Sequence, residues 1–225
     1  MDQPVTVDRT HEELVDPLAP PTFAPSGPPK TAAQAIADGD WLGSINIWLY
    51  SLDPEPSIIY QLRAPTVLWE PNKLDLAGGG HYSAGESGLD GLRELQEELG
   101  ITIPRDKLQF FGPRLLAGVD AKGRERKWHI SVYVGEYAGT LEAMTLQEEE
   151  VYGVFKVPLK PLMQVFHGQA ESLEVVGKDA HGNSLPYTIT LQSFPYNFDD
   201  YQRKMAEFIA LKTGVDDTYL SGRTA

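Results

Sequence analysis

The sequence contains no cysteine. This absence excludes disulfide bonds, thiolate metal sites, iron–sulfur clusters and catalysis by a cysteine nucleophile or acid. Basic residues are also few: 19 Lys and Arg face 32 Asp and Glu, and the formal charge of −13 argues against sequence-independent binding to nucleic-acid polymers. No apolar run reaches the roughly 18 to 20 residues of a membrane span. The first residues show no secretory signal, so we expect a cytoplasmic protein that does not bind membranes.

The composition is that of an ordinary globular protein, with 225 residues of which 41% are hydrophobic and 23% charged. Proline is concentrated in residues 16–29, where it disfavours a helix or a central strand. We therefore expect a partly extended N-terminal arm over residues 1–40 and one folded domain over residues 41–225. Two roles are open for the arm, covering a pocket or contacting the partner of a homodimer.

Hydrophobic alternation predicts most of the elements. Strands are expected at residues 44–50, 57–63, 74–77, 108–118, 127–137 and 151–157, with a basic hairpin loop before the strand at 127 and a later hairpin turning at 181–183. Short helices are expected at 31–38 and 159–166, and a last one at 199–213. Mixed strands with helices at several places predict an α+β fold, a mostly β core covered by helices.

The segment GGGHYSAGESGLDGLRELQEELGI, residues 78–101, carries the chemistry. We read it as a glycine-rich loop followed by a helix at 89–99. At about 100° per residue, leucines form one stripe of this helix, and Glu94, Glu97 and Glu98 fall together on the opposite side. Like charges at this spacing repel, and hard oxygen ligands in such a cluster suit Mg²⁺ or Mn²⁺. A solvated helix face is the alternative, but the preceding glycines favour a ligand site.

This segment resembles the Nudix box, in which Gly and Glu precede Arg-Glu-aliphatic-any-Glu-Glu-any-Gly. Gly80, Glu86 and the run from Arg93 to Ile101 match in order, but six residues separate Glu86 from Arg93 where the pattern has seven. Either the loop is one residue shorter, or Gly79 and Gly85 hold the positions of the first Gly and first Glu. The role of Glu86 stays open at this point.

The resemblance implies an α/β/α sandwich with a mixed sheet and a metal-dependent pyrophosphohydrolase activity. By position, the metal ligands would be Glu94, Glu97 and Glu98, with Gly80 or Gly79 adding a carbonyl, and Arg93 would orient Glu94. Members of the family often add a Glu from a later loop. The candidates here are Glu148, Glu149 and Glu150. Of these, we assign Glu149, the middle residue, to the predicted catalytic residues. The cofactor implied is Mg²⁺, with Mn²⁺ as an alternative.

Substrate contacts are assigned to basic and imidazole side chains that a diphosphate would attract: Arg63, His81, Arg124 and Arg126. A weaker resemblance to the isopentenyl-diphosphate isomerase-like branch covers residues 12–166, but isomerases of that branch use a cysteine that this chain lacks. We therefore expect hydrolysis of a nucleoside diphosphate linked to another moiety. The alternatives are a catalytically weak Nudix-fold module that binds nucleotides and, less favoured, an isomerase of prenyl diphosphates.

Overall fold

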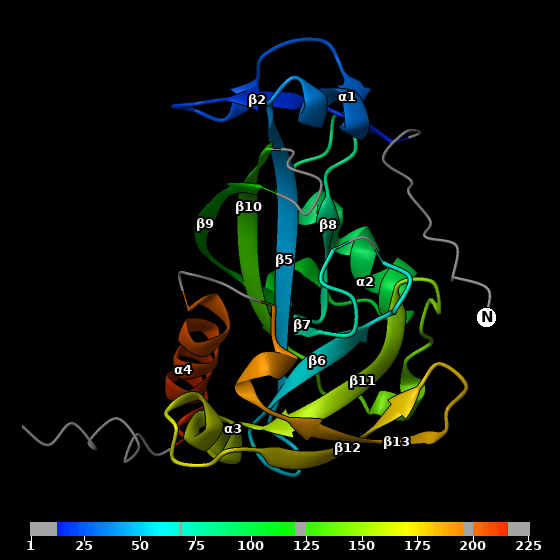
Figure 1. Cartoon of the computed structure of the whole chain (residues 1–225), viewed down its shortest axis with the longest axis vertical. Coiled ribbons are helices and arrows are strands. Elements are labelled where there is room, and N and C mark those ends of the chain that lie inside the picture. Colours follow the sequence, from blue (N-terminus) through cyan, green and yellow to red (C-terminus); the bar gives the residue numbers. More distant parts are fainter. Residues whose placement is uncertain (1–12, 68, 120–124, 196–199, 216–225) are drawn as a thin grey trace, which may run out of the picture.

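The computed structural model describes residues 13–67, 69–119, 125–195 and 200–215. Figure 1 shows an α+β fold in which one large sheet runs through the molecule and a C-terminal helix lies beside it. The principal strands, in spatial order, are β13 (Ser184–Ile189), β12 (Leu173–Asp179), β11 (Val151–Pro158), β6 (Ser57–Arg63), β5 (Trp41–Ser51), β10 (Glu125–Glu136) and β9 (Leu108–Val119). In the described residues, β5 and β10 pair in parallel and the other pairs are antiparallel, so the sheet is mixed.

The long strand β5 explains why helices cover both faces of the sheet. Its side chains alternate: Ile45, Ile47 and Leu49 pack into one core, while Trp48 and Tyr50 pack into another. The first core takes Leu95 and Leu99 from helix α2 (Arg93–Leu99), and the second takes residues of α3 (Leu159–Phe166) and α4 (Tyr201–Thr213). Burying each large apolar side chain contributes about 1.5–3 kcal/mol, which holds the helices on the sheet. The predicted α+β class, with its three layers, is confirmed.

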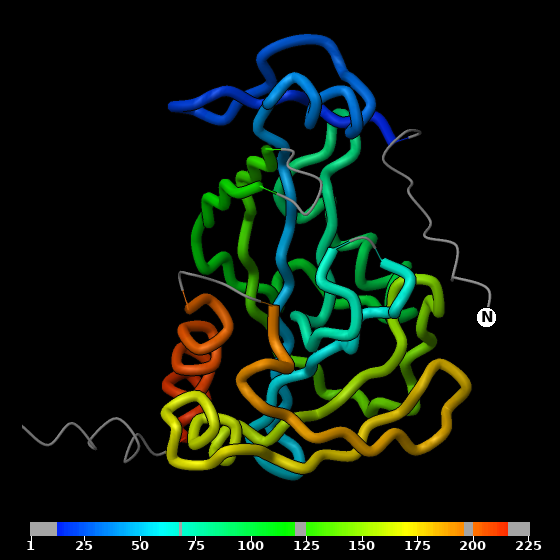
Figure 2. The backbone as a smooth tube through the Cα atoms, in the orientation of Figure 1, coloured from blue at the N-terminus to red at the C-terminus, as the bar shows by residue number. Residues whose placement is uncertain are grey.

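The proline-rich stretch is not a free linker. Strand β2 (Pro17–Ala19) pairs with β3 (Ala24–Pro25) and with the start of β5, at a sheet edge where proline's missing amide is tolerated. Strands β1 (Leu14–Val15) and β4 (Lys30–Thr31) pair with each other, and α1 (Ala32–Ala37) follows with Thr31 as its cap. A third small core joins the segment to the sheet through Val15, Ala32, Ala35, Ile36 and Leu42. The backbone trace shows this segment lying at one end of β5 (Figure 2).

The helix of the glycine-rich segment begins later than expected. A 3₁₀ turn occupies Gly88–Leu92, and the α-helix proper spans only Arg93–Leu99. Gly88, the first residue of this turn, has a φ of +53°, outside the right-handed helical region, and the side chain of Asp90 accepts a hydrogen bond from the amide of Ser87. The helix ends as predicted at Gly100, whose φ of +67° few other residues adopt.

The remaining elements agree closely with the sequence. Strand β6 and helix α3 have the expected bounds, and the last hairpin turns at Gly182 with a φ of +82°. Short strands β7 (Leu74–Asp75) and β8 (Gly78–His81) replace the single strand expected at 74–77. The tip of the basic hairpin, with Lys122 and Arg124, lies outside the described residues. In the part of the chain that the structure describes, no helix is long and apolar enough to cross a membrane.

Candidate active site at the glycine strand

The glycine run at residues 78–80 forms a strand, where the sequence had indicated a loop. Strand β8 pairs antiparallel with β5 and places Gly80 opposite Ile45. A methyl group on Gly80 would collide with the carboxylate of Glu94, and one on Gly78 would lie 2.7 Å from Leu95. Glycine is therefore required here because helix α2 lies directly against the strand. The Gly80 carbonyl, a predicted metal ligand, accepts a hydrogen bond of 2.8 Å from Ser44 Oγ.

Two carboxylates of α2 are buried beside this strand. Glu94 is 7% exposed and Glu98 is 4% exposed. Burial raises the pKa of Glu94 to about 7, with Arg93 opposing the shift and nearby acidic groups adding to it. Burial, Glu94 and Glu150 also raise the pKa of Glu98 well above its usual value. One oxygen of Glu98 accepts a 3.0 Å hydrogen bond from Gln61 Nε2, which fixes its direction.

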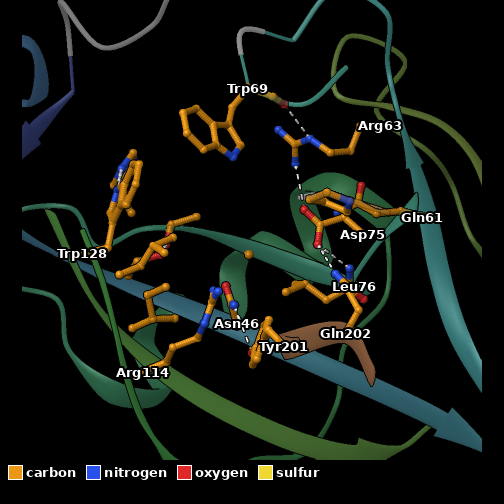
Figure 3. Close-up of a pocket in the computed structure, with 17 residues that line it drawn as sticks. Asn46, Gln61, Arg63, Trp69, Asp75, Leu76, Arg114, Trp128, Tyr201 and Gln202 are labelled. Carbon is orange, nitrogen blue, oxygen red and sulfur yellow. Dashed lines mark hydrogen bonds and ion pairs between the residues drawn. The ribbon is translucent and has the colours of Figure 1, made fainter. Parts of the chain in front are cut away.

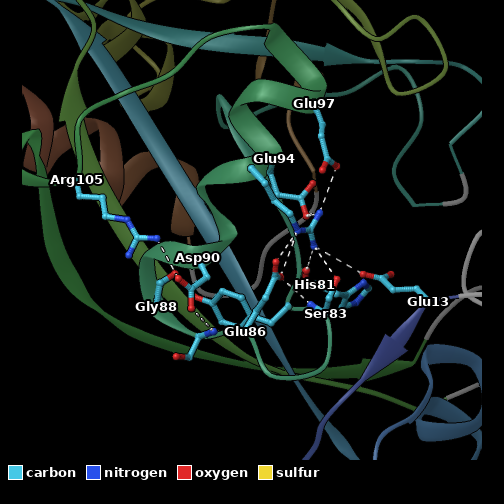
Figure 4. Close-up of polar contacts among 12 residues, drawn as sticks. Glu13, His81, Ser83, Glu86, Gly88, Asp90, Glu94, Glu97 and Arg105 are labelled. Carbon is cyan, nitrogen blue, oxygen red and sulfur yellow. Dashed lines mark hydrogen bonds and ion pairs between the residues drawn. The ribbon is translucent and has the colours of Figure 1, made fainter.

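Arg93 organises the carboxylates around it (Figure 4). Its Nε donates to both oxygens of Glu86 at 3.0 and 3.2 Å, and its Nη1 lies 2.9 Å from Glu94 and 3.2 Å from Glu97. Its Nη2 donates to the His81 carbonyl at 2.9 Å. This gives Glu86 a position in spite of the shorter loop, since it clamps the arginine that in turn faces Glu94.

The three glutamates of the box do not share one open face. Glu94 and Glu98 are buried, whereas the Glu97 side chain is 52% exposed and lies at the outer side of Arg93. The helical wheel had placed all three together opposite the leucines. The difference arises because the glycines of β8 let the strand pack directly against the short helix. Part of the acidic face of the helix is therefore buried against the strand.

Of the three later glutamates, the structure brings Glu150 to the site. Its charge contributes to the raised pKa values of Glu94 and Glu98. Glu148 approaches the exposed His181 at 3.5 Å. The backbone carbonyl of Glu149 accepts a hydrogen bond from Thr66, and its charge is not among the causes of either shift. The electrostatic influence on Glu94 and Glu98 therefore favours Glu150 over Glu149.

A pocket of about 210 Å³ lies beside the carboxylates (Figure 3). Gln61 and Gly80 belong both to its wall and to the surroundings of the glutamates. Two aromatic rings, Trp69 and Trp128, meet edge to face at 5.7 Å on one side. Gln61 and Gly80 thus separate the pocket from Glu98 and Glu94, and a molecule bound in it would lie one residue away from those carboxylates.

Cationic side chains line the same pocket. Arg63 is held by the Trp69 carbonyl at 2.9 Å and by Asp75 at 3.6 Å, and Arg114 lies 4.0 Å above the ring of Tyr201. His81 also lines it and accepts a 2.9 Å hydrogen bond from Trp128 Nε1.

The surroundings of His81 keep its ring neutral. Burial, with Arg126 and Arg93 nearby, lowers the pKa of His81 to about 4. Arg126 is itself 9% exposed and belongs to strand β10, so it is not on the hairpin tip, and its charge acts on the pocket residue His81. Of the predicted substrate contacts, Arg63 and His81 are therefore in the pocket, Arg126 is near it, and Arg124 lies outside the described residues.

Several pocket residues were not singled out from the sequence. Tyr201 and Gln202 come from α4, and Tyr201 OH accepts hydrogen bonds from Trp48 and Asn46 at 2.9 and 3.1 Å. No local motif marks them, because Asn46 lies 155 residues from Tyr201 and Asp75, to which Gln202 donates, lies 127 residues from Gln202. Trp128 had a usable signal, since it occupies an alternating strand position next to the predicted basic loop.

The residues present fit a divalent cation shared with a substrate. Among the described residues, no three carboxylate or imidazole groups converge into a complete metal cage. Mg²⁺ does not require one, because it commonly binds through one or two carboxylates together with water and phosphate oxygens. Glu94 and Glu98 supply hard oxygen donors from one helix, and the absent side chain of Gly80 makes the space that Glu94 fills.

Comparisons with known proteins add a family context. No protein-family model matches the sequence. An uncharacterised Nudix hydrolase of Clostridium acetobutylicum is 29% identical over 150 residues, which are 66% of this chain and 72% of that protein. Nudix hydrolase 3 of Arabidopsis thaliana is 31% identical over 140 residues, 59% of this chain and only 18% of that protein. A crystal structure of a MutT protein from Methanosarcina mazei is 16% identical, covers 76% of this chain and 94% of that one, and has a TM-score of 0.47.

Proposed function

We propose that this chain, which its sequence relatives group with the Nudix hydrolase superfamily, is a metal-dependent pyrophosphohydrolase. Its substrate would be a nucleoside diphosphate linked to another moiety. The observation that carries the proposal is the pair of buried carboxylates, Glu94 and Glu98, set against a glycine strand at the wall of a pocket.

The carboxylates need a cation. Glu94 and Glu98 are buried, Glu86 and Glu97 stand close to them, and Arg93 is a positive charge among them, with Arg63 also acting on Glu98. A divalent ion would offset this repulsion and, when bound, would polarise the diphosphate and lower the pKa of a water. We expect Glu94 and Glu98 to hold it, with Glu97 and Glu150 on the outer side.

The other residues of the site orient the metal-binding carboxylates or bind the substrate. Arg93 fixes Glu94 and is itself fixed by Glu86, so the donor oxygens are positioned before the cation arrives. Gln61 does the same for Glu98. Arg63 and Arg114 offer positive charge to phosphate oxygens, while Trp69 and Trp128 offer apolar rings to a base or ribose.

Turnover in Glu98→Gln tests the proposal. The amide is nearly isosteric but binds Mg²⁺ poorly, so we expect the rate to fall on the order of 10²-fold or more. Phosphate and nucleotide release would be followed with ADP-ribose, dinucleotides, sugar nucleotides and nucleoside triphosphates, in Mg²⁺ and in Mn²⁺. Glu174→Gln, the same change on the exposed face of β12, should turn over like the parent protein. Equal rates in parent and Glu98→Gln would refute the proposal.

A binding module that does not hydrolyse its nucleotide is the second candidate. The shorter loop between Glu86 and Arg93 favours it, since that loop shapes the approach to Glu94. Calorimetry that detects nucleotide binding with Mg²⁺, while no product forms over many hours, would select the binding module. An isomerase of prenyl diphosphates is disfavoured because the chain has no cysteine.

A further inference from the structure

The N-terminal segment is fastened to the loop that precedes the acidic helix. The Leu14 carbonyl accepts a 2.7 Å hydrogen bond from the amide of Ala84, and Asp16 accepts another of 2.7 Å from the amide of Gly85. Gly85 has a φ of +86°, a conformation that glycine readily adopts, and its amide points at the segment. The next residue along is Glu86, which clamps Arg93.

This attachment carries Glu13 to the carboxylate cluster. An oxygen of Glu13 lies 3.9 Å from Arg93 Nη2, whereas Glu94 and Glu97 face Nη1. Figure 4 shows Glu13 joined to the same group of polar contacts as Glu94 and Glu97. The Glu13 side chain is 30% exposed, so it is only partly accessible to solvent. Burial raises the pKa of Glu13, and Glu86, Glu150 and Glu97 add to the shift, which places these four carboxylates within electrostatic reach of one another.

We propose that Glu13 is a positioning residue of the metal site, so that the segment 13–16 is part of the catalytic centre. This inference rests on the proposed function. Glu13 acts in two connected ways: its charge increases the attraction of the cluster for a divalent cation, and its contact with Arg93 completes the ring of acceptors that holds the guanidinium in place.

A structural role alone would not require a carboxylate at position 13. The backbone of Leu14 and the side chain of Asp16 already fasten the segment to the loop, and a core formed by Val15 and α1 holds it on the sheet. Glu13 adds nothing to those contacts. It adds one negative charge to a place where Arg93 already faces three other carboxylates.

Direct metal binding by the full-length protein tests the inference. Mn²⁺ would be titrated without substrate and followed by calorimetry and by the loss of its free electron paramagnetic resonance signal. We expect Glu13→Gln to raise the Mn²⁺ dissociation constant about threefold to tenfold, as removal of one nearby charge predicts in a partly hydrated site. Glu13→Asp keeps the charge and should stay within about twofold of the parent. The melting temperature of the metal-free protein should hardly change in either variant.

Two controls separate the possible outcomes. Asp38→Asn removes a charge from the same N-terminal segment, where Asp38 pairs with Lys30 at 2.7 Å, and should leave Mn²⁺ affinity unchanged. Glu98→Gln should abolish Mn²⁺ binding. Unchanged affinity in Glu13→Gln, or equal weakening in Glu13→Gln and Asp38→Asn, overturns the inference while the proposed function stands. Normal Mn²⁺ binding by Glu98→Gln overturns the proposed function itself.

Discussion

At the residue scale, the main feature of the site is a pair of buried carboxylates. Glu94 and Glu98 are almost inaccessible to solvent, and charged groups of this kind are costly to bury without a partner. Arg93 forms an ion pair with Glu94, and Gln61 donates a hydrogen bond to Glu98. Because the pKa values of Glu94 and Glu98 are raised, these carboxyl groups bind protons more tightly in the folded, metal-free protein than in the unfolded chain. This difference can be measured.

The difference in proton binding makes the free energy of unfolding depend on pH. In the unfolded chain the pKa of Glu94 is near 4.5, whereas in the folded protein it is about 7. Between these values the folded state binds more protons at Glu94 than the unfolded state, so the contribution of Glu94 to the stability of the metal-free protein falls as pH rises and levels off above pH 7. We expect Glu94→Gln to remove on the order of 1–3 kcal/mol of the fall between pH 5 and pH 8, measured by urea unfolding in EDTA.

Glu174→Gln is the matched control for this measurement, because its side chain is exposed. It should reproduce the pH profile of the parent. An identical slope in the parent and in Glu94→Gln would show that Glu94 titrates normally and is not buried as described.

The roles of single residues were predicted unevenly. The spacing of Glu94, Glu97 and Glu98 located the acidic helix, because helical periodicity is a local property. That periodicity could not tell that a strand would bury two of them and leave Glu97 outside. Likewise the run 148–150 indicated a contributing glutamate, but only the packing of the chain distinguishes Glu150 from its neighbours.

At the scale of elements, strand β8 is the piece on which the site is built. Glycine is a poor strand former, so the run at residues 78–80 was expected to be a loop. Pairing with β5 on one side and close contact with α2 on the other override that preference. Elements with strong local patterns, such as β6 and α3, were predicted with their bounds, since alternation and amphipathic spacing need no distant partner.

Gly80→Ala tests the contact between strand and helix. The added methyl group would take the place of the Glu94 carboxylate, so we expect the carboxylate to move and Mn²⁺ affinity to fall by about tenfold or more. Overpacking should also cost about 1–3 kcal/mol in the free energy of unfolding. Calorimetric Mn²⁺ titration and urea unfolding measure the two effects.

Gly118→Ala provides the comparison for that variant. Gly118 lies in strand β9, and a methyl group there would meet no atom within 4 Å. Its metal affinity should equal that of the parent. A normal dissociation constant in Gly80→Ala would mean that β8 does not hold Glu94 in place.

At the scale of the whole molecule, a formal charge of −13 surrounds a site that we expect to bind an anion. The field of such a protein repels a diphosphate at long range. Arg63 and Arg114 line the pocket and Arg126 stands near it, so positive charge is gathered locally where the general field is unfavourable. A bound divalent cation would add to this local attraction.

Metal binding should therefore stabilise the entire fold. A ligand that binds only the folded state at one hundred times its dissociation constant contributes about 2.7 kcal/mol, which corresponds to a rise of about 5–10 °C in Tm for a chain of this size. We expect Mn²⁺ to produce this rise at pH 8 and EDTA to reverse it, as measured by differential scanning calorimetry.

The double variant Glu94→Gln/Glu98→Gln shows whether that stabilisation comes from the proposed site. Its Tm should not respond to Mn²⁺, while that of Glu174→Gln should rise like the parent's. A rise of the same size in the double variant would place the stabilising cation elsewhere on the molecule.

The attachment of Asp16 to Gly85 also determines when the site can form during protein synthesis. The two residues are 69 positions apart in the chain. On the ribosome, the segment that carries Asp16 emerges well before its partner has been translated, and Glu150 emerges later still. The site therefore cannot form until Gly85, and after it Glu150, has left the exit tunnel.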